Sequence, residues 1–394
     1  MAFGKKISQR KRNKQNLVID LFRKNEYLSK AQVKNLAGYS MDTIISIFES
    51  LIKYNLIVET DGEQKPLGRK AVFYQLNSEK NLYVGITFNQ SGIYTTLMSF
   101  SYEVIDSFTT DLPVNITKDI FLELFALHNK DFFQDKSHYS KDIKMVGLSI
   151  PGNINNNTGI MKNYTLLPFL ENVNFKEIIN DIFPDHEVII EHNIKSMTSY
   201  FLSNKQMIDE NRLILYISVR SGIASGIIYN GEIFPGKGEF GHIKVTDEDR
   251  ECICGRKGCL DLYFSFNSIY ESLKNIINFN NLDRPMNVII SEYNKGNPEV
   301  TEMIQKGYKL FTSAIIDTVN ILNPDLVILS GQVLSVFDDP IAELERNAKI
   351  IFQDSGFVDH FSKTKFTYEN LGSDISSKGI CYSMIKSHWD YITE

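Results

Sequence analysis

The sequence predicts an α/β protein in which a small helical module with a β wing precedes two larger α/β halves. Residues 12–78 carry three short helical patterns followed by two strand patterns, and from residue 81 onward strands alternate with helices. The same order of elements recurs in residues 82–191 and 213–329, which indicates two related halves with a ligand cleft between them. A chain of 394 residues also has room for two or three folded units.

Composition and charge narrow the class of protein. Hydrophobic residues make up 43% of the chain and charged residues 23%, as in ordinary soluble globular proteins. No apolar run approaches a membrane span, and the N-terminus carries lysines and arginines without an apolar signal core, so we expect a cytoplasmic protein without membrane contact. Residues 1–78 have a net charge of +7, whereas the remainder has −13. This asymmetry favours a nucleic-acid binder attached to a sensor or enzyme, with a solvated basic tail as the alternative.

The helical module is delimited by capping residues. Ser29 and Gln32 form a capping-box pattern at the start of the second helix, Gly38 ends that helix, and Ser40 caps the third. One apolar stripe is predicted on each helix: Leu17, Val18, Leu21 and Phe22 on the first, Val33, Leu36 and Ala37 on the second, and Ile44, Ile45, Phe48, Leu51 and Ile52 on the third. We therefore expect three helices that share one core.

Two strand patterns, residues 56–59 and 71–76, complete a winged helix-turn-helix over residues 1–78. This fold predicts a double-stranded DNA partner, and a helical protein-docking module is the alternative. The first turns of the third helix would meet base edges in the major groove, and the wing would reach phosphate or the minor groove. The predicted DNA-binding residues are Met41, Asp42, Thr43, Ser46, Arg69 and Lys70.

Three of the four cysteines lie close together in the sequence and follow a histidine. His242, Cys252, Cys254 and Cys259 fall within 18 positions, a set that can form a closed tetrahedral Cys₃His shell. A closed shell has no open position for substrate, so these residues predict a structural zinc ion as cofactor. The alternative is a group of ordinary buried thiols.

The same segment resembles the signature of the ROK family, which comprises repressors, open reading frames and kinases of sugars. Glu239–His242 reads EFGH and Cys252–Cys259 reads CICGRKGC, similar to the family's Glu-x-Gly-His pair followed by Cys-x-Cys-Gly-x-x-Gly-Cys. Ser149–Gly152 resembles the family's Pro-Gly loop, and Asn323–Leu329 resembles the strand before its adenosine loop.

This resemblance implies the fold of the larger part of the chain. Residues 79–394 are expected to form the family's actin-like (ribonuclease-H-like) two-lobed sugar-kinase fold, with a zinc loop at residues 242–259. Residues 1–78 resemble the operator-binding domain of the family's repressors of the xylose and N-acetylglucosamine type.

The resemblance also implies a sugar or sugar derivative as ligand. A carboxylate can accept from neighbouring sugar hydroxyls, and an amide or imidazole can both donate and accept. The residues that match the family's sugar contacts are Asn163, Asn193, Glu239, His242 and Asp261. His242 would serve the metal and the sugar together. Asp261 stands where the family commonly carries glutamate, which has a longer side chain.

The kinase machinery of the family is altered at four places. Residues 87–92 read TFNQSG, where the family's kinases carry an Asp-x-Gly-Gly-Thr-Lys turn. Residues 220–224 read RSGIA, where those kinases carry Gly-Thr-Gly-x-Gly. Residues 329–332 lack the first glycine of the pair expected in the adenosine loop. Asn193 stands where the catalytic aspartate is expected, and an amide cannot take the proton from a sugar hydroxyl. The sequence therefore predicts no catalytic residues and no enzymatic activity.

Together these features predict a sugar-responsive DNA-binding transcriptional regulator, a repressor of carbohydrate-utilisation genes with an inactive ROK domain as sensor. A homodimer or homotetramer is expected, because paired helix-turn-helix units read paired half-sites. Closure of the cleft on the sugar would change the separation of the two DNA-binding modules. Two alternatives stay open: a sensor domain that binds a transport-system protein in place of a free sugar, and an active sugar kinase.

Overall fold

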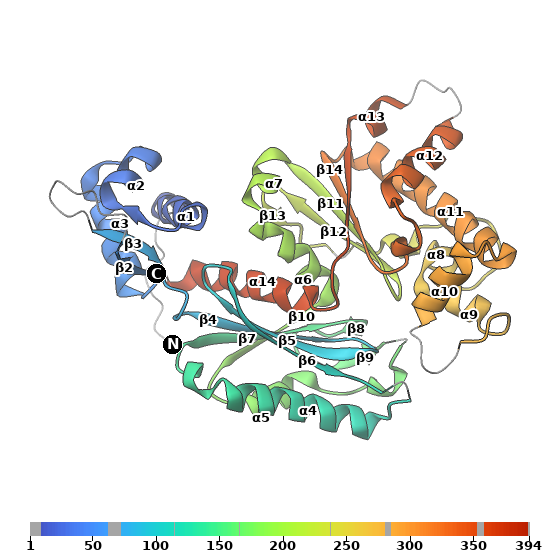
Figure 1. Cartoon of the computed structure of the whole chain (residues 1–394), viewed down its shortest axis with the longest axis horizontal. Coiled ribbons are helices and arrows are strands. Elements are labelled where there is room, and N and C mark those ends of the chain that lie inside the picture. Colours follow the sequence, from blue (N-terminus) through green and yellow to red (C-terminus); the bar gives the residue numbers. More distant parts are fainter. Residues whose placement is uncertain are drawn as a thin grey trace. The chain divides into compact units, whose positions relative to one another are not determined.

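The computed structural model describes residues 9–61, 72–113, 115–164, 166–236, 238–279, 285–352 and 358–392. The chain divides into two compact units, one formed by residues 1–196 and 376–394 and the other by residues 197–375 (Figure 1). Each unit contains its own five-stranded sheet, and the first also contains the N-terminal helical module.

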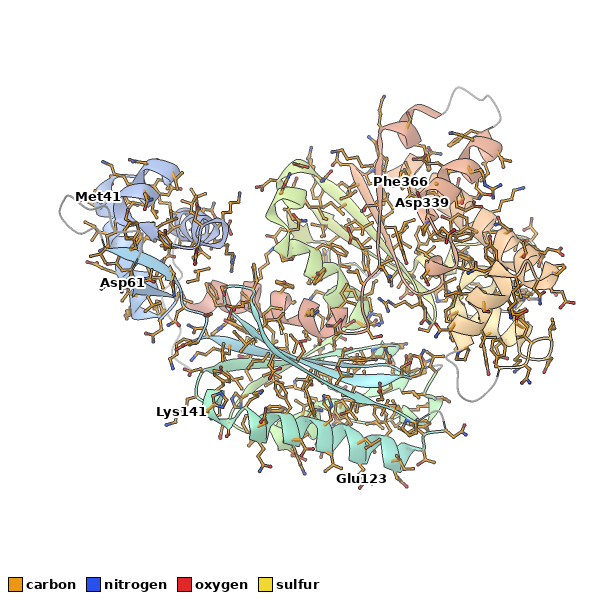
Figure 2. All side chains as sticks on the ribbon, in the orientation of Figure 1. Met41, Asp61, Glu123, Lys141, Asp339 and Phe366 are labelled. Carbon is orange, nitrogen blue, oxygen red and sulfur yellow. The ribbon has the colours of Figure 1, made fainter. Side chains whose placement is uncertain are left out.

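The N-terminal module contains the predicted three helices. They are α1 (Gln9–Lys24), α2 (Lys30–Ala37) and α3 (Met41–Lys53), with a small sheet of β1 (Leu28–Ser29), β3 (Phe73–Leu76) and β2 (Ile57–Thr60) in that order. Phe48 on α3 lies at the centre of their core, where its ring is 5.7 Å from that of Phe22 and 5.0 Å from that of Tyr74. The side chains of the module appear in Figure 2, with Met41 and Asp61 labelled.

The predicted caps of these helices are confirmed. The Ser29 hydroxyl accepts from the Gln32 backbone amide, and the Gln32 side chain accepts from the Ser29 backbone amide, which completes the capping box. Gly38 adopts the left-handed conformation with φ 70° and ends α2. Ser40 caps α3 by accepting from the amide of Thr43.

The predicted apolar stripes are wrong at four positions. Ile45 and Ile52 on α3, Leu17 on α1 and Leu36 on α2 are exposed, whereas Ile47 is buried. At 100° per residue, the stripe that faces the core of α3 follows the spacing i, i+3, i+4 and i+7. Its members are Ile44, Ile47, Phe48 and Leu51. Ile45 and Ile52, seven residues apart, therefore lie together beside this stripe and not within it.

The sheet of the first unit has the order β10-β7-β4-β5-β6. Its strands are β4 (Leu82–Phe88), β5 (Gly92–Ser99), β6 (Val104–Asp111), β7 (Ile143–Ile150) and β10 (Glu187–His192), and a hairpin of β8 (Asn153–Ile154) and β9 (Met161–Asn163) follows β7. Helices α4 (Lys118–Asp135) and α5 (Phe175–Ile182) cover one face of the sheet, and α14 (Ile375–Ile392) covers the other (Figure 1).

Helix α14 packs very close to this sheet because two adjacent strands carry glycine at the contact. A Cβ atom on Gly85 of β4 would overlap the Ser377 carbonyl oxygen and come within 2.7 Å of the Cys381 Sγ. A Cβ on Gly147 of β7, the register partner of Gly85, would lie 2.8 Å from the Ile380 side chain. Side chains at these two positions would push α14 off the sheet.

The second unit repeats the topology of the first sheet, with the order β13-β12-β11-β14-β15. In both sheets three antiparallel strands are followed by two parallel strands, which confirms the predicted recurrence. The strands are β11 (Leu213–Val219), β12 (Ile223–Tyr229), β13 (Glu232–Ile233), β14 (Leu326–Ser330) and β15 (Lys365–Glu369).

Most helices of the second unit belong to one apolar core with its sheet. They include α8 (Asp261–Phe264), α9 (Phe266–Leu273), α10 (Pro285–Asn294), α11 (Pro298–Leu322), α12 (Pro340–Phe352) and α13 (Val358–Lys363). Helices α6 (Asn193–Tyr200), which spans the boundary between the units, and α7 (Lys205–Glu210) precede β11. The strand expected within residues 323–329 is present as β14.

Candidate functional site

One histidine and three cysteines of the second unit bring their side chains together. The donor atoms of His242, Cys252, Cys254 and Cys259 all lie within 4.8 Å of one another. The Nδ1 atom of His242 is 3.5 Å from the Cys252 Sγ, and the Sγ atoms of Cys254 and Cys259 are 3.6 Å apart. Thiolates about 2.3 Å from a tetrahedral ion lie about 3.8 Å from one another. The cluster can therefore hold a metal ion.

The loop that carries the cysteines is folded by its own backbone. The Cys252 amide donates to the Arg256 carbonyl and the Gly255 amide to the Cys252 carbonyl, at 2.8 and 2.9 Å. Gly255 and Gly258 both have positive φ, and a Cβ on Gly258 would overlap the Thr246 carbonyl oxygen. Glycine is therefore required at residue 258 by both conformation and space.

The buried surroundings of two of the thiols disfavour their charged thiolate forms. Cys252 and Cys259 are buried. Burial raises the pKa of the Cys259 thiol to about 12, and it also raises the pKa of Cys252. A positive ion offsets this cost, because it stabilises the charged thiolates that buried surroundings disfavour.

Of the predicted sugar-binding residues, His242 belongs to this cluster, and Glu239 and Asp261 lie near it in the second unit. The Glu239 Oε2 lies 4.0 Å from the Nε2 of His242, the imidazole nitrogen that faces away from Cys252. Asp261 begins α8, directly after the metal-ligand loop, and its Oδ1 accepts from the Ile223 amide at 2.8 Å. Burial raises the pKa of Asp261, while the Ile223 amide and His242 oppose that increase.

The glycine within the EFGH segment allows this close arrangement. A Cβ on Gly241 would lie 2.6 Å from the Ile223 carbonyl oxygen and 3.0 Å from the Asp261 Oδ1. Glycine at 241 therefore lets the segment that carries Glu239 and His242 pack directly on the Ile223 turn and on Asp261.

The other two predicted sugar residues, Asn163 and Asn193, belong to the first unit, so the five residues fall into two sets. Asn163 is exposed on β9, and Asn193 is half-buried at the start of α6. Glu191, two residues before Asn193, is not among the residues predicted from the sequence. Its buried carboxylate accepts from Ser196 and Ser383 and pairs with Lys195 at 2.5 Å. The sequence does contain one signal for Glu191, because it is a carboxylate near the end of an apolar strand.

The predicted DNA-binding residues are only partly described. Met41, Asp42 and Ser46 are exposed on the first turns of α3, and the Thr43 hydroxyl lies 2.9 Å from that of its capping residue Ser40. Arg69 and Lys70, predicted on the wing, lie outside the described residues.

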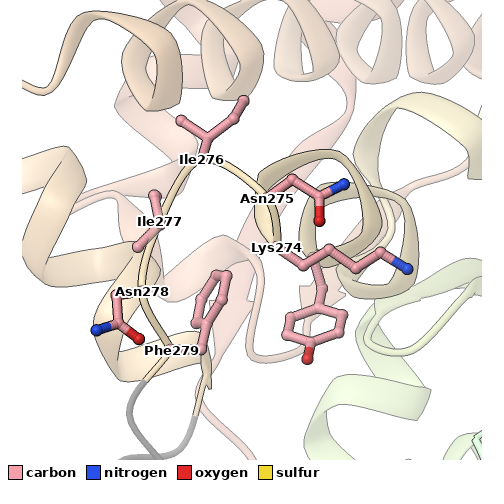
Figure 3. A pocket seen from close by; sticks show the side chains of 7 residues that line it. Lys274, Asn275, Ile276, Ile277, Asn278 and Phe279 are labelled. Carbon is pink, nitrogen blue, oxygen red and sulfur yellow. The ribbon is translucent and has the colours of Figure 1, made fainter.

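A pocket of about 450 Å³ lies elsewhere in the second unit (Figure 3). It is lined by Tyr270, Lys274, Asn275, Ile276, Ile277, Asn278 and Phe279. None of the predicted sugar, metal or DNA residues belongs to it. Among the described residues, no helix is long and apolar enough to cross a membrane.

The family model described as "ROK family" matches residues 106–366, more than half of the chain and including the whole Cys₃His segment. The chain belongs to the ROK family. The ROK resemblance of the sequence is thereby confirmed.

Relatives and solved structures extend this likeness beyond the matched segment. A xylose repressor of Caldicellulosiruptor bescii is 26% identical, with 94% of each chain covered. The crystal structure of a ROK family transcriptional regulator, a homologue of the Escherichia coli MLC protein, has a TM-score of 0.73 at 19% identity and covers 97% of this chain and 98% of that one. A ROK hexokinase from Thermus thermophilus has a TM-score of 0.60 at 15% identity, covering 78% of this chain and 99% of that one. The predicted α/β fold class is confirmed.

ROK kinases are expected to hold phosphate in two loops. In both loops of this chain, backbone amides donate hydrogen bonds to side chains of the protein itself. The Asn89 Oδ1 accepts from the amides of Ser91 and Gly92, at 2.7 and 3.1 Å, in the turn after β4. In the second loop, the Ile223 amide donates to Asp261 and the Arg220 guanidinium donates to the Leu371 carbonyl at 3.0 Å. These donors are already paired within the protein, so a phosphate would have to displace existing hydrogen bonds.

The metal-ligand cluster yields the first testable prediction. Cys254→Ser should lower the metal content from about one ion per chain and reduce thermal stability, because an incomplete shell binds the ion weakly. Elemental analysis and thermal unfolding of the purified full chain measure both effects. Cys381→Ser is the matched control, since Cys381 is a buried thiol on α14 outside the cluster. A wild-type chain that folds fully and carries no metal would contradict the prediction.

Proposed function

We propose that this protein is a sugar-responsive transcriptional repressor, in which residues 1–78 bind operator DNA and residues 79–394 form the sensor. The observation that carries the proposal is the likeness to a xylose repressor over 94% of both chains, together with the three helices and small sheet that precede the ROK segment. A repressor requires DNA in the same compartment, so a cytoplasmic location is part of this proposal.

The N-terminal module supplies the DNA interface in this proposal. Its charge of +7 attracts the phosphate backbone, and the first turns of α3 present Met41, Asp42, Thr43 and Ser46 to base edges. Arg69 and Lys70 of the wing are proposed to contact phosphate. The chain would act as a homodimer or homotetramer, because paired modules bind half-sites about 34 Å apart.

The proposed metal ion is a structural zinc. Three thiolates and one imidazole are preferred zinc ligands, and together they fill a tetrahedral shell and leave no position for a catalytic water. If the ion is bound to the Nδ1 of His242, the opposite nitrogen is directed to Glu239. The metal-ligand loop and the proposed sugar contacts are thereby linked through a single imidazole ring.

The proposed ligand is a sugar or sugar derivative, with Glu239 and His242 as its main contacts. The Glu239 carboxylate is two-thirds exposed and can accept from two neighbouring hydroxyls, while part of Asp261 is committed to the Ile223 amide. Asn163 and Asn193 remain predicted contacts. The name of the relative makes D-xylose the first sugar to test.

A contact between the N-terminal module and the first sheet offers a route for coupling sugar binding to DNA binding. The Arg23 guanidinium, in the last turn of α1, lies 3.9 Å from the Tyr102 ring centroid and donates to the Phe100 carbonyl at 3.3 Å. The Tyr102 ring is in turn 4.7 Å from that of Tyr382 on α14, in an edge-to-face arrangement. Since α14 follows directly on residues of the second unit, this chain of contacts can pass a change there to α1.

The proposal includes the absence of kinase activity. Asn193 replaces the expected catalytic base, and the phosphate-loop amides are already bonded to Asn89 and Asp261. The likeness to a hexokinase keeps an active sugar kinase as the second candidate function. A sensor that binds a transport-system protein is the remaining alternative, and an operator titration also tests it.

The operator titration is the main test of the proposed function. A monosaccharide that stabilises the chain in a thermal-shift panel, with D-xylose included, should weaken operator binding by about 5- to 150-fold. Fluorescence anisotropy with and without the sugar measures this change. Glu239→Ala should remove the response and leave DNA affinity intact, because the truncation deletes a hydroxyl acceptor. Glu251→Ala, an exposed carboxylate of the same loop, is the matched control. Equal operator affinities with and without every sugar would favour the protein-partner alternative.

The enzymatic prediction is tested separately. Purified wild-type protein should release no ADP from ATP in the presence of the sugars of the panel, and Asn193→Asp alone should not restore activity, because the phosphate-loop amides stay occupied. A coupled ADP-release assay, with a ROK sugar kinase as positive control, makes the measurement. Sugar-dependent turnover by the wild-type chain would establish the kinase alternative.

If the Arg23 contact couples the two binding sites, its removal should weaken the coupling without removing either binding activity. Arg23→Ala should retain operator binding and sugar binding, but the effect of sugar on operator affinity should fall by about 0.5–2 kcal/mol, the range of a cation–π contact. The same anisotropy titration measures it. Arg212→Ala is the control, since Arg212 lies over the Tyr229 ring in the second unit, 5.2 Å from its centroid. Unchanged coupling in Arg23→Ala would exclude this route.

A further inference from the structure

Two large apolar side chains on the first turns of α3 are exposed beside the stripe that faces the core of the module. Met41 is 37% exposed and Ile45 is 36% exposed, whereas the helix buries Ile44, Ile47, Phe48 and Leu51. Because these four residues fix the rotation of the helix, the exposure of Met41 and Ile45 follows from the packing of the core.

The surrounding positions are unusual for a helix that reads DNA. Asp42 and Ser46 are exposed beside Met41 and Ile45, and the Thr43 hydroxyl is paired with Ser40. No arginine, lysine, asparagine or glutamine occurs between residues 40 and 50. These four residue types make the bidentate contacts to guanine and adenine, so this face lacks the groups for the commonest forms of base recognition.

We propose that Met41 and Ile45 recognise thymine through its 5-methyl group, and that Asp42 accepts a hydrogen bond from a cytosine amino group. The proposal rests on the proposed DNA-binding function and adds the chemistry of its base recognition. Ile45 lies four residues after Met41 and three after Asp42, so it is a surface neighbour of both, and the three side chains can meet adjacent base pairs. Apolar contact with the methyl group and a carboxylate acceptor for cytosine are the pairings that these side chains allow.

Charge supports duplex DNA as the occupant of this face. The module has a net charge of +7, and Lys34 on α2 is exposed. Glu49 is exposed one turn after Ile45 and would repel phosphate. The close approach to DNA is therefore confined to the N-terminal part of α3, the part that helix-turn-helix proteins place in the major groove.

The experiment begins with selection of bound duplexes from a random-sequence library by the full wild-type chain. In the selected half-site, each thymine is then replaced singly by deoxyuridine, which removes the methyl group and leaves base pairing unchanged. At one or two thymines this replacement should weaken binding by about three- to fivefold, the effect of one buried methyl group. Fluorescence anisotropy measures each affinity, and this step needs no protein variant.

Variants then assign the contact to a residue. Ile45→Ala should abolish the difference between thymine and deoxyuridine at one position, and Met41→Ala at another, while the salt dependence of binding is unchanged. Ile52→Ala is the matched control: Ile52 is 41% exposed on the same face but lies about 10 Å farther along the helix. It should leave every thymine preference intact.

The outcomes separate this inference from the proposed function. Failure to select any DNA would contradict DNA binding itself. Selection of a specific site that is insensitive to deoxyuridine, or whose sensitivity persists in both Ile45→Ala and Met41→Ala, would overturn methyl recognition and leave the repressor function standing. A half-site read mainly through guanine would also overturn it.

Discussion

The close packing of α14 on the first sheet is the constraint on which the organisation of the chain depends. Helix α14 is the last element of the chain, yet it completes the first unit, because Gly85 and Gly147 leave no side chain between the strands and the helix. Buried polar contacts fix its position: the Thr96 hydroxyl lies 2.8 Å from that of Ser377, and the Tyr83 hydroxyl lies 2.7 Å from the His388 Nδ1. The first unit can therefore be complete only after the second has been synthesised.

The packing of α14 on the first sheet also places Tyr382 beside Tyr102, the residue that Arg23 contacts. Tyr102 lies in the turn between β5 and β6 with a left-handed backbone conformation, φ 71°, which directs its ring between Arg23 and Tyr382. A residue other than glycine in that conformation carries a cost that the surrounding contacts must offset. Helices α1 and α14 are thus joined through the Tyr102 ring, although they are separated by most of the sequence.

The sequence predicted those features that depend on local patterns. The capping box at Ser29, the glycine stop at Gly38 and the repeated order of strands all follow from short-range preferences, and the Cys₃His cluster follows from ligand spacing. The burial of Ile45 was predicted wrongly, because an apolar residue beside a core stripe cannot be assigned to that stripe from hydrophobicity alone.

Features that depend on distant parts of the chain were not predicted. Strand β15 and helix α14 take their places through pairing with β14 and packing on Gly85, contacts that span many residues. Likewise, nothing in the local sequence indicated that Asp261 would accept from the Ile223 amide, or that Glu191 would connect α6 to α14 through Ser383. Such polar contacts are specified by tertiary packing, which periodicity does not encode.

The polar groups near the metal-ligand cluster and in the two phosphate loops bear on the proposed sensing role. Phosphoryl transfer requires backbone amides free to meet phosphate, whereas here Asn89 and Asp261 accept from those amides. Glu239 and His242, in contrast, retain polar atoms that are not committed to holding a loop, apart from the imidazole nitrogen on the cysteine side. Sugar binding requires hydrogen-bond acceptors and donors in fixed positions. A metal ion bound to His242 would fix the orientation of this imidazole without taking part in a reaction. In the proposed repressor, the paired loop amides would therefore not serve phosphoryl transfer, whereas Glu239 and His242 would serve recognition of the sugar.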